Sequence, residues 1–282
     1  MSVRIITDST ADLIPAVKSR LTVVPLTLRF GDQEFIDGIT ISHKEFYEKL
    51  VESDVLPTTS QATPAMFEDV FRPVAEAGDS AVVLTLSSKL SGTYQSARIA
   101  AAEFENIHVV DTESVAIGAG ILAERALQLA DQGLSALQIT QRLEQEKKNI
   151  RVIAMVDTLE YLKRGGRVSK TVAFAGGLLN IKPVLSVVGG EINMLGKARG
   201  SKQGNNLLVT EIQKAGGVDF NRPVLLGYTG MSDVLLQKYM EDSKALWADS
   251  RTELNTTVIG SVIGTHTGPG TIAAAFFRKG TD

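Results

Sequence analysis

No cysteine occurs among the 282 residues, and histidine occurs only three times. The absence of cysteine excludes a disulfide framework, a thiolate metal site and a cysteine nucleophile, and it suits a reducing cytoplasm. A basic excess is also missing, because 29 Lys and Arg residues stand against 32 Asp and Glu residues and the formal net charge is -3. Sequence-independent nucleic-acid binding needs many cationic contacts with phosphates, so we expect no nucleic-acid partner.

Long apolar runs and cofactor motifs are missing as well. No apolar run approaches the roughly 20 residues that span a bilayer, and the chain begins with a polar-flanked strand rather than a signal peptide. We therefore expect a cytoplasmic protein with at most transient membrane contact. The sequence has no GxxxxGK[ST] loop, no GxGxxG after the first predicted strand and no zinc-ligand spacing. We predict neither a nucleotide or nicotinamide cofactor nor a metal.

The composition is that of a globular protein with room for two domains. Hydrophobic residues make up 44% of the chain and charged residues 22%. Strands and helices alternate up to about residue 150, which predicts a parallel sheet with helices on both faces. Beyond that point, a β-hairpin with a glycine turn at residues 182–195 predicts a mixed sheet. The predicted fold class is α/β, with a parallel-sheet domain at residues 1–150 and a mixed-sheet domain at 151–282.

Apolar periodicity, capping boxes that start at Ser42 and Ser135, an N-cap at Thr63 and glycine stops give the individual elements. Strands are expected at 3–7, 21–30, 81–86, 107–112, 151–156, 182–188, 191–195, 223–228 and 256–264. Helices are expected at 43–50, 65–71, 94–104, 114–130, 135–149, 158–164, 169–180, 204–215, 232–247 and 268–277.

The stretch at residues 84–97 has the pattern of an anion site. An apolar run suited to a buried parallel strand leads through a hydroxyl-rich turn into an alanine-rich helix. Such a turn aims free backbone N–H groups and the positive end of the helix dipole at one point, where an anion fits. Gly92 lets a ligand approach the backbone, and Ser91 and Thr93 add hydroxyl donors. Ser91 is equally suited to capping the helix, and the two roles are compatible.

Two further polar stretches gain weight if they fold next to Ser91. Thr59, Ser60 and Gln61 form a polar cluster just before a helix that we expect to begin at Pro64. His266 lies among threonines and glycines, at what we expect to be a strand-to-helix turn, where a histidine can donate to a carboxylate or order a serine hydroxyl. A purely structural histidine remains the alternative there.

Two basic clusters and one acidic residue complete the candidates. Residues 163–167 and 197–199, which include Arg167 and Arg199, either face solvent or recognise a phosphate or an acidic partner surface. A serine hydrolase with Ser91 as nucleophile and His266 as base is a rival hypothesis, although Ser91 lacks the G-x-S-x-G context. That enzyme would need an acid, for which Asp8 is the candidate. A regulatory protein with a small anionic ligand is a third possibility.

Five stretches together resemble the DegV family, and they run from the first predicted strand to the last predicted helix. They are Thr7-Asp8-Ser9-Thr10-Ala11-Asp12-Leu13, Thr59-Ser60-Gln61, residues 87–97, Leu159-Glu160-Tyr161-Leu162-Lys163-Arg164-Gly165-Gly166-Arg167 and Gly264-Thr265-His266-Thr267-Gly268-Pro269-Gly270. The resemblance implies a two-domain α/β protein that binds one long-chain fatty acid between its domains. It implies a lipid-carrying subunit, not an enzyme by itself, which presents the carboxylate to a separate ATP-dependent fatty-acid kinase subunit for acyl-phosphate formation.

The resemblance also implies roles for individual residues. Thr59 and Ser91 would hold the carboxylate, and His266 would join the same hydrogen-bond network. Arg167 would lie near the mouth of the site, toward the kinase or its phosphate. Where the family often has Pro-Ser-Pro, this chain has Ala62-Thr63-Pro64, which we expect to change the stiffness of the loop more than its chemistry.

Overall fold

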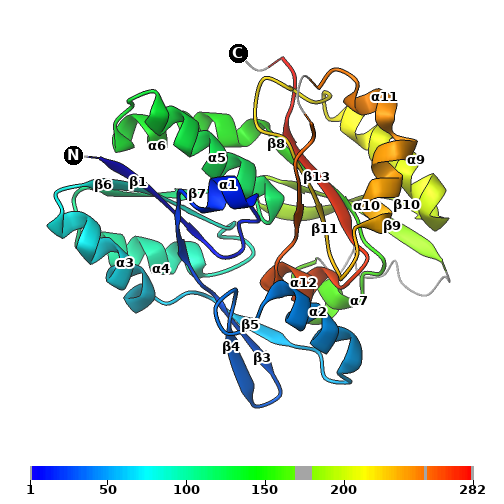
Figure 1. Cartoon of the computed structure of the whole chain (residues 1–282), viewed down its shortest axis with the longest axis horizontal. Helices are drawn as coiled ribbons and strands as arrows, with labels where there is room; N and C mark the ends of the chain where they lie inside the picture. The colour runs from blue at the N-terminus through cyan, green and yellow to red at the C-terminus, as the bar shows by residue number, and fades with distance from the viewer. Residues whose placement is uncertain (1, 169–179, 251–252, 281–282) are drawn as a thin grey trace.

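A parallel sheet is built from the first part of the chain in the computed structural model, which describes residues 2–168, 180–250 and 253–280. Its strand order is β2 (Thr22–Val24), β1 (Val3–Asp8), β6 (Ser80–Thr85) and β7 (Ile107–Asp111), and all neighbours are parallel. Helices α3 (Pro64–Glu76) and α4 (Thr93–Ala101) cover one face (Figure 1). Helices α5 (Ile117–Asp131) and α6 (Ala136–Glu146) cover the other.

The apolar run in β6 is continuous because both of its faces are buried. Val82 and Leu84 belong to the cluster that includes α5 and α6, whereas Ala81 and Val83 belong to the cluster that includes α3 and α4. Successive strand side chains point to opposite faces, so a strand covered on both sides needs apolar residues at every position. The predicted parallel sheet is thus confirmed.

A six-stranded mixed sheet occupies the second part of the chain. Its order is β10 (Glu191–Arg199), β9 (Ile181–Val188), β8 (Ile150–Met155), β13 (Ile272–Phe277), β11 (Leu225–Tyr228) and β12 (Thr256–Val258). Only β11 and β12 pair in parallel, and the hairpin of β9 and β10 is confirmed. The helices that follow β8 are α7 (Glu160–Gly165), α9 (Gly200–Lys214), α10 (Val234–Asp242), α11 (Lys244–Trp247) and α12 (Ser261–Thr267), and a 3-10 turn at Lys147–Asn149 precedes β8.

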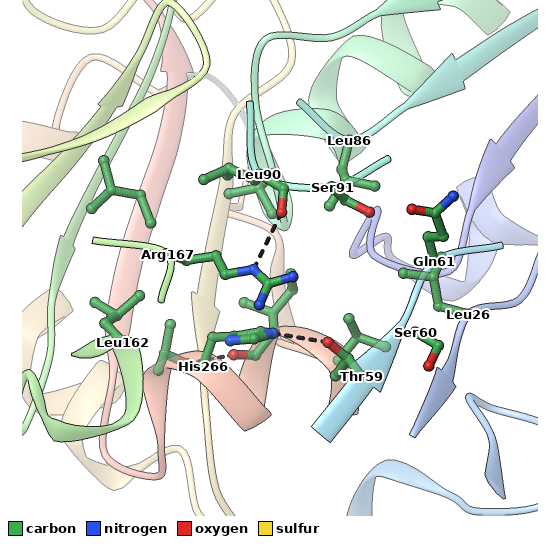
Figure 2. A pocket seen from close by; sticks show the side chains of 15 residues that line it. Leu26, Thr59, Ser60, Gln61, Leu86, Leu90, Ser91, Leu162, Arg167 and His266 are labelled. Carbon is green, nitrogen blue, oxygen red and sulfur yellow. Dashed lines mark hydrogen bonds between the residues drawn. The ribbon is translucent and has the colours of Figure 1, made fainter. Parts of the chain in front are cut away.

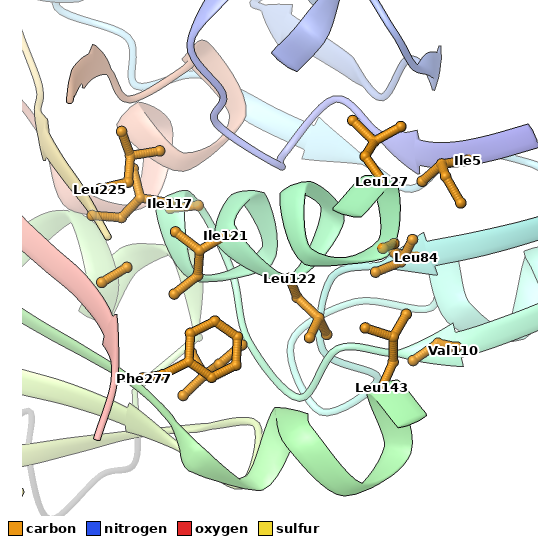
Figure 3. Packing of buried hydrophobic residues seen from close by; sticks show 14 of the residues in the cluster. Ile5, Leu84, Val110, Ile117, Ile121, Leu122, Leu127, Leu143, Leu225 and Phe277 are labelled. Carbon is orange, nitrogen blue, oxygen red and sulfur yellow. The ribbon is translucent and has the colours of Figure 1, made fainter. Parts of the chain in front are cut away.

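Helix α5 lies between the two sheets, and Figure 3 shows its side chains reaching both. The cluster around Ile117 and Ile121 includes Ile5 from β1 as well as Leu225 and Phe277 from β11 and β13. One apolar core therefore joins the parallel sheet to the mixed sheet. The strands of the first lie within residues 3–111 and those of the second within 150–277, and the domain division at residue 150 stays a prediction.

A third, antiparallel sheet was not predicted. It has the order β4 (Gln33–Ile36), β3 (Thr27–Phe30) and β5 (Thr58–Ser60), and it stands beside α2 (His43–Glu52). The single strand predicted at 21–30 is wrong, because β2 and β3 belong to different sheets and are separated around Pro25, which lacks a backbone N–H for pairing. A short helix, α1 (Pro15–Lys18), connects β1 to β2.

The strand predicted at 256–264 is confirmed only at its start, by β12, because residues 261–264 belong to helix α12. The last predicted helix is wrong, since residues 272–277 form strand β13. All six residues of β13 are buried between two neighbouring strands, so tertiary contacts override the helical preference of its three alanines. The predicted helix at 232–247 is interrupted at Ser243, and the one at 169–180 falls almost entirely outside the described residues.

Both predicted capping boxes, at Ser42 and Ser135, are confirmed, as is Thr63 as the N-cap of α3. None of the helices in the described part of the chain has the length and apolar character needed to cross a bilayer.

Candidate functional site

Segments from β5, the β6–α4 loop, the end of α7 and helix α12 meet around one pocket (Figure 2). Thr59, Ser91, Arg167 and His266 all line it, although 207 residues separate the first from the last. About 560 Å³ of empty space, part of it open to solvent, lies between them. The structure therefore brings together four of the residues singled out in the sequence.

The loop that carries Ser91 is fixed at its start and at its end. Its first residue, Leu86, donates its backbone N–H to the buried carboxylate of Asp8 at 2.7 Å. At the other end, the Ser91 hydroxyl accepts the backbone N–H of Thr93 at 3.2 Å and shares a hydrogen bond of 2.9 Å with the Thr93 hydroxyl. Ser91 thus supports the first turn of α4, whose N-cap residue is Gly92, and it also faces the pocket.

Gly92 and Thr93 are not among the residues that line the pocket. Thr93 is buried behind Ser91, and the space beside Gly92 is filled by Gln61. A Cβ atom at position 92 would lie under 3.0 Å from the Gln61 side chain, whose amide donates to Ser96 at 2.9 Å. A side chain at position 92 would therefore displace the amide of Gln61, a pocket residue that the sequence shows only as part of a polar cluster.

His266 lies in the last turn of α12, not at a strand-to-helix turn as expected. Its Nε2 atom shares a hydrogen bond of 3.0 Å with the hydroxyl of Thr59 on β5 (Figure 2). Its other nitrogen, Nδ1, faces Gly165 at the end of α7, where a Cβ atom would lie under 3.0 Å from the ring. The imidazole thus lies between the hydroxyl of Thr59 on one side and the backbone of Gly165, which has no side chain, on the other.

The electrostatics of the pocket favour an anionic group with an apolar body. Arg167 is exposed at its edge and donates to the backbone oxygens of Leu90 and Gly165 at 3.3 Å and 2.6 Å. The described lining contains no carboxylate. The remaining wall is mainly apolar, and its aliphatic residues are Leu26, Leu86, Leu90, Val115, Leu162, Ile192, Val262 and Ile263.

Arg199 is not brought to this pocket. It is the last residue of β10 and is exposed, and it is absent from the lining. A role in recognising a partner or a phosphate stays a prediction for Arg199.

A family model described as "Uncharacterised protein, DegV family" matches residues 2–279. The chain belongs to the DegV family. A DegV domain-containing protein of Deinococcus radiodurans is 36% identical over 282 residues, which cover 98% of each chain.

Two solved structures of the DegV fold are similar over nearly the whole chain. One, described as fatty acid binding of a DegV family protein from Thermus thermophilus, has a TM-score of 0.87 at 34% identity and covers 98% of this chain and 100% of that one. The other, described as a fat acid (stearic acid)-binding protein from Eubacterium ventriosum, has a TM-score of 0.85 at 28% identity and covers 99% of both chains.

The hydrolase hypothesis is not favoured by the geometry of this DegV site. The Ser91 hydroxyl is bonded to Thr93, and His266 Nε2 is bonded to Thr59. The Nδ1 atom of His266, which an orienting acid would have to contact, has no hydrogen-bond partner among the described residues. Asp8, the candidate acid, is buried and accepts hydrogen bonds from Thr10 and Leu86 instead.

The pKa of His266 should make the stability of the protein depend on pH. Burial, together with the nearby positive charge of Arg167, lowers this pKa to about 4 from its usual 6.5. Between these values the unfolded chain binds a proton that the folded site does not, so stability falls as the pH drops through this window. Urea unfolding at pH 7 and at pH 4.5 should show that the stability advantage of wild type over His266→Gln shrinks at the lower pH. A difference that is independent of pH would contradict a neutral His266.

Proposed function

We propose that this protein binds one long-chain fatty acid, with the carboxylate between Thr59, Ser91 and His266 and the acyl chain against the apolar wall. The observation that carries the proposal is the pocket itself: neutral donors and one arginine at a polar end, aliphatic side chains elsewhere, and no carboxylate in the described lining. The fatty acids named for the solved relatives from Thermus thermophilus and Eubacterium ventriosum support it.

The polar end suits a carboxylate because it offers hydroxyl and imidazole groups and Arg167, and no carboxylate in the described lining would repel the ligand. Ser91 and Thr59 supply hydroxyl groups, and a neutral His266 accepts from or donates to Thr59 as the ligand requires. Hydrogen bonds to an ionised acceptor are stronger than neutral ones. The acyl chain supplies most of the affinity, since at about 0.8 kcal/mol per buried CH₂ a chain of about 16 carbons outweighs the head group even after ordering costs.

We infer further that the carboxylate is presented to a separate ATP-dependent kinase subunit, and that the protein alone does not catalyse the transfer. The position of Arg167 supports this, because its guanidinium is exposed at the edge of the pocket and matches a phosphoryl group in a bidentate manner. In the groove beside it, Lys89 is paired with Glu191 at 3.1 Å, so Arg167 supplies the net positive charge of that groove. The protein mixed with ATP and palmitate should form acyl phosphate only when the kinase subunit is added.

Solvent extraction of the purified protein tests the fatty-acid proposal directly. Mass spectrometry should find a fatty acid at close to one molecule per chain, or the delipidated protein should take up palmitate or oleate to that ratio. Empty protein that ignores both lipids would defeat the proposal. Preferential binding of inorganic phosphate or a short organic acid would favour a small-anion regulator, and labelling of Ser91 by a fluorophosphonate would favour the hydrolase.

Ser91→Ala should weaken palmitate binding by about 10- to 100-fold while leaving the fold intact, since a hydrogen bond to a charged group contributes about 1.5–3 kcal/mol. Ser88→Ala is the matched control, because Ser88 lies on the same loop, is exposed and does not line the pocket. Isothermal titration with palmitate measures both. Equal affinity in the two variants would remove Ser91 from the site.

A further inference from the structure

The last residue of β1 and the turn that follows it contribute two buried carboxyl groups that the pocket does not use. Asp8 is fully buried, Asp12 is 4% exposed, and neither lines the fatty-acid pocket. Burial raises the pKa of both groups above the ordinary value. Carboxyl groups are almost never fully buried unless they are paired or hydrogen-bonded, because their desolvation destabilises the fold.

Each of these carboxylates holds the start of an element that carries a pocket residue. Asp8 accepts the backbone N–H of Leu86, the residue that opens the loop to Ser91, at 2.7 Å. Asp12 accepts the backbone N–H of Gly260, the N-cap residue of α12, at 2.7 Å. The loop and the helix lie far apart in the sequence, yet both of their starts are hydrogen-bonded to carboxylates that are only four residues apart.

Position 260 shows how closely Asp12 and α12 fit together. A Cβ atom on Gly260 would lie 3.1 Å from Asp12 Oδ1 and 3.1 Å from His43 Nε2, so α12 begins directly against the carboxylate. Residues just before the helix are tied to the same region, since Thr257 donates to the backbone oxygen of Leu13 at 3.1 Å and Tyr47 donates to that of Ile259 at 2.8 Å.

Helix α12 transmits the position of its start to His266. It spans only Ser261–Thr267, so His266 lies less than two turns from Gly260. Because a helix is rigid over this length, a shift of its first turn moves the imidazole by a similar amount. His266 meets Thr59 through a single hydrogen bond, which a displacement of about 1 Å would break.

We propose that Asp12 is a positioning residue for the carboxylate site: it fixes the start of α12 and thereby the distance between His266 and Thr59. Asp8 fixes the start of the Ser91 loop in the same way. The proposal rests on the fatty-acid function for its consequence in binding. Its structural content, the placement of His266, does not depend on any ligand.

The experiment compares Asp12→Ala, which removes the acceptor, with Asp12→Asn, whose amide oxygen still accepts the N–H of Gly260. In Asp12→Ala, the pKa of His266, measured by NMR titration, should rise from about 4 toward 6.5 because the ring leaves its buried place beside Arg167. Palmitate affinity should fall at least 10-fold. Asp12→Asn should restore both. Asp79→Asn is the matched control, because Asp79 is 8% exposed but its carboxylate accepts from Ser2 and Arg4 rather than from α12 or the Ser91 loop.

A merely structural role for Asp12 would lower the melting temperature and leave the His266 titration unchanged, and that result would overturn the proposal. If Asp12→Ala does not fold, Asp8→Asn provides the second test. Its single carbonyl oxygen cannot replace two carboxylate oxygens that accept from Thr10 and Leu86, so palmitate affinity should fall with His266 unmoved. If the wild-type protein does not bind palmitate, the fatty-acid function is rejected. The role of Asp12 in placing His266 is then still tested by the pKa of His266 in the Asp12 variants.

Discussion

Gly165→Ala should weaken fatty-acid binding by about 10- to 100-fold. Gly165 is the last residue of α7, and a Cβ atom there would lie under 3.0 Å from Nδ1 of His266. The imidazole must then move away from Gly165, and it loses its hydrogen bond of 3.0 Å with Thr59. In the proposed complex, the displaced imidazole also loses its contact with the carboxylate, and a hydrogen bond to such a charged group contributes about 1.5–3 kcal/mol, where every 1.4 kcal/mol changes affinity tenfold. Titration calorimetry with palmitate gives the affinity.

The neighbouring Gly166 provides a control, because a substitution there strains the backbone without contacting His266. Gly166 has a φ of +69°, and a Cβ atom at that position would meet no other atom within 4 Å. Gly166→Ala should therefore destabilise the fold by about 1 kcal/mol through backbone strain and leave palmitate binding unchanged. If the two variants weaken binding equally, the effect is one of general stability and His266 is not part of the carboxylate site.

Ile121→Ala should lower the free energy of unfolding by about 3–4 kcal/mol, within the range for large-to-small substitutions in a core. Ile121 is fully buried on α5, in the cluster that joins the parallel and mixed sheets. Leu137→Ala on α6 is the control, since its side chain is 52% exposed and the substitution should change stability by less than about 0.5 kcal/mol.

Urea unfolding of the Ile121→Ala variant also tests the shared core. A cavity beside both sheets should shift one cooperative transition as a whole. Two separate transitions, of which only one moves, would show that the sheets unfold independently and that α5 belongs to one of them.

The parts of the fold that follow from local pattern were predictable. The apolar run before Ser91 gave a buried parallel strand, and the serines of the two capping boxes gave the starts of α2 and α6. The parts decided by distant contacts were not. The alanines of β13 have a helical preference that two flanking strands override, and the third sheet depends on the pairing of Leu28 with Thr59 across the intervening helix α2.

The same division applies to the site. Thr59, Ser91, Arg167 and His266 stood out because hydroxyls, glycines and charges gather around them in the sequence. Gly165 did not stand out, and Gln61 did so only as a member of a polar cluster, because the importance of each lies in a contact with a residue distant in the sequence, His266 in one case and Gly92 in the other. The apolar wall was hidden for another reason, since its leucines and valines have the same periodicity as ordinary core residues.

The placement of α5 has a consequence for how the proposed lipid ligand would enter and leave. Swinging the two sheets apart as rigid halves would hydrate Ile117, Ile121 and their partners on both sides of the helix, and each large aliphatic side chain exposed in this way costs about 1.5–3 kcal/mol. Exchange of an acyl chain should therefore proceed through small local displacements at the pocket rim. Its rate should be insensitive to cross-links that fasten one sheet to the other.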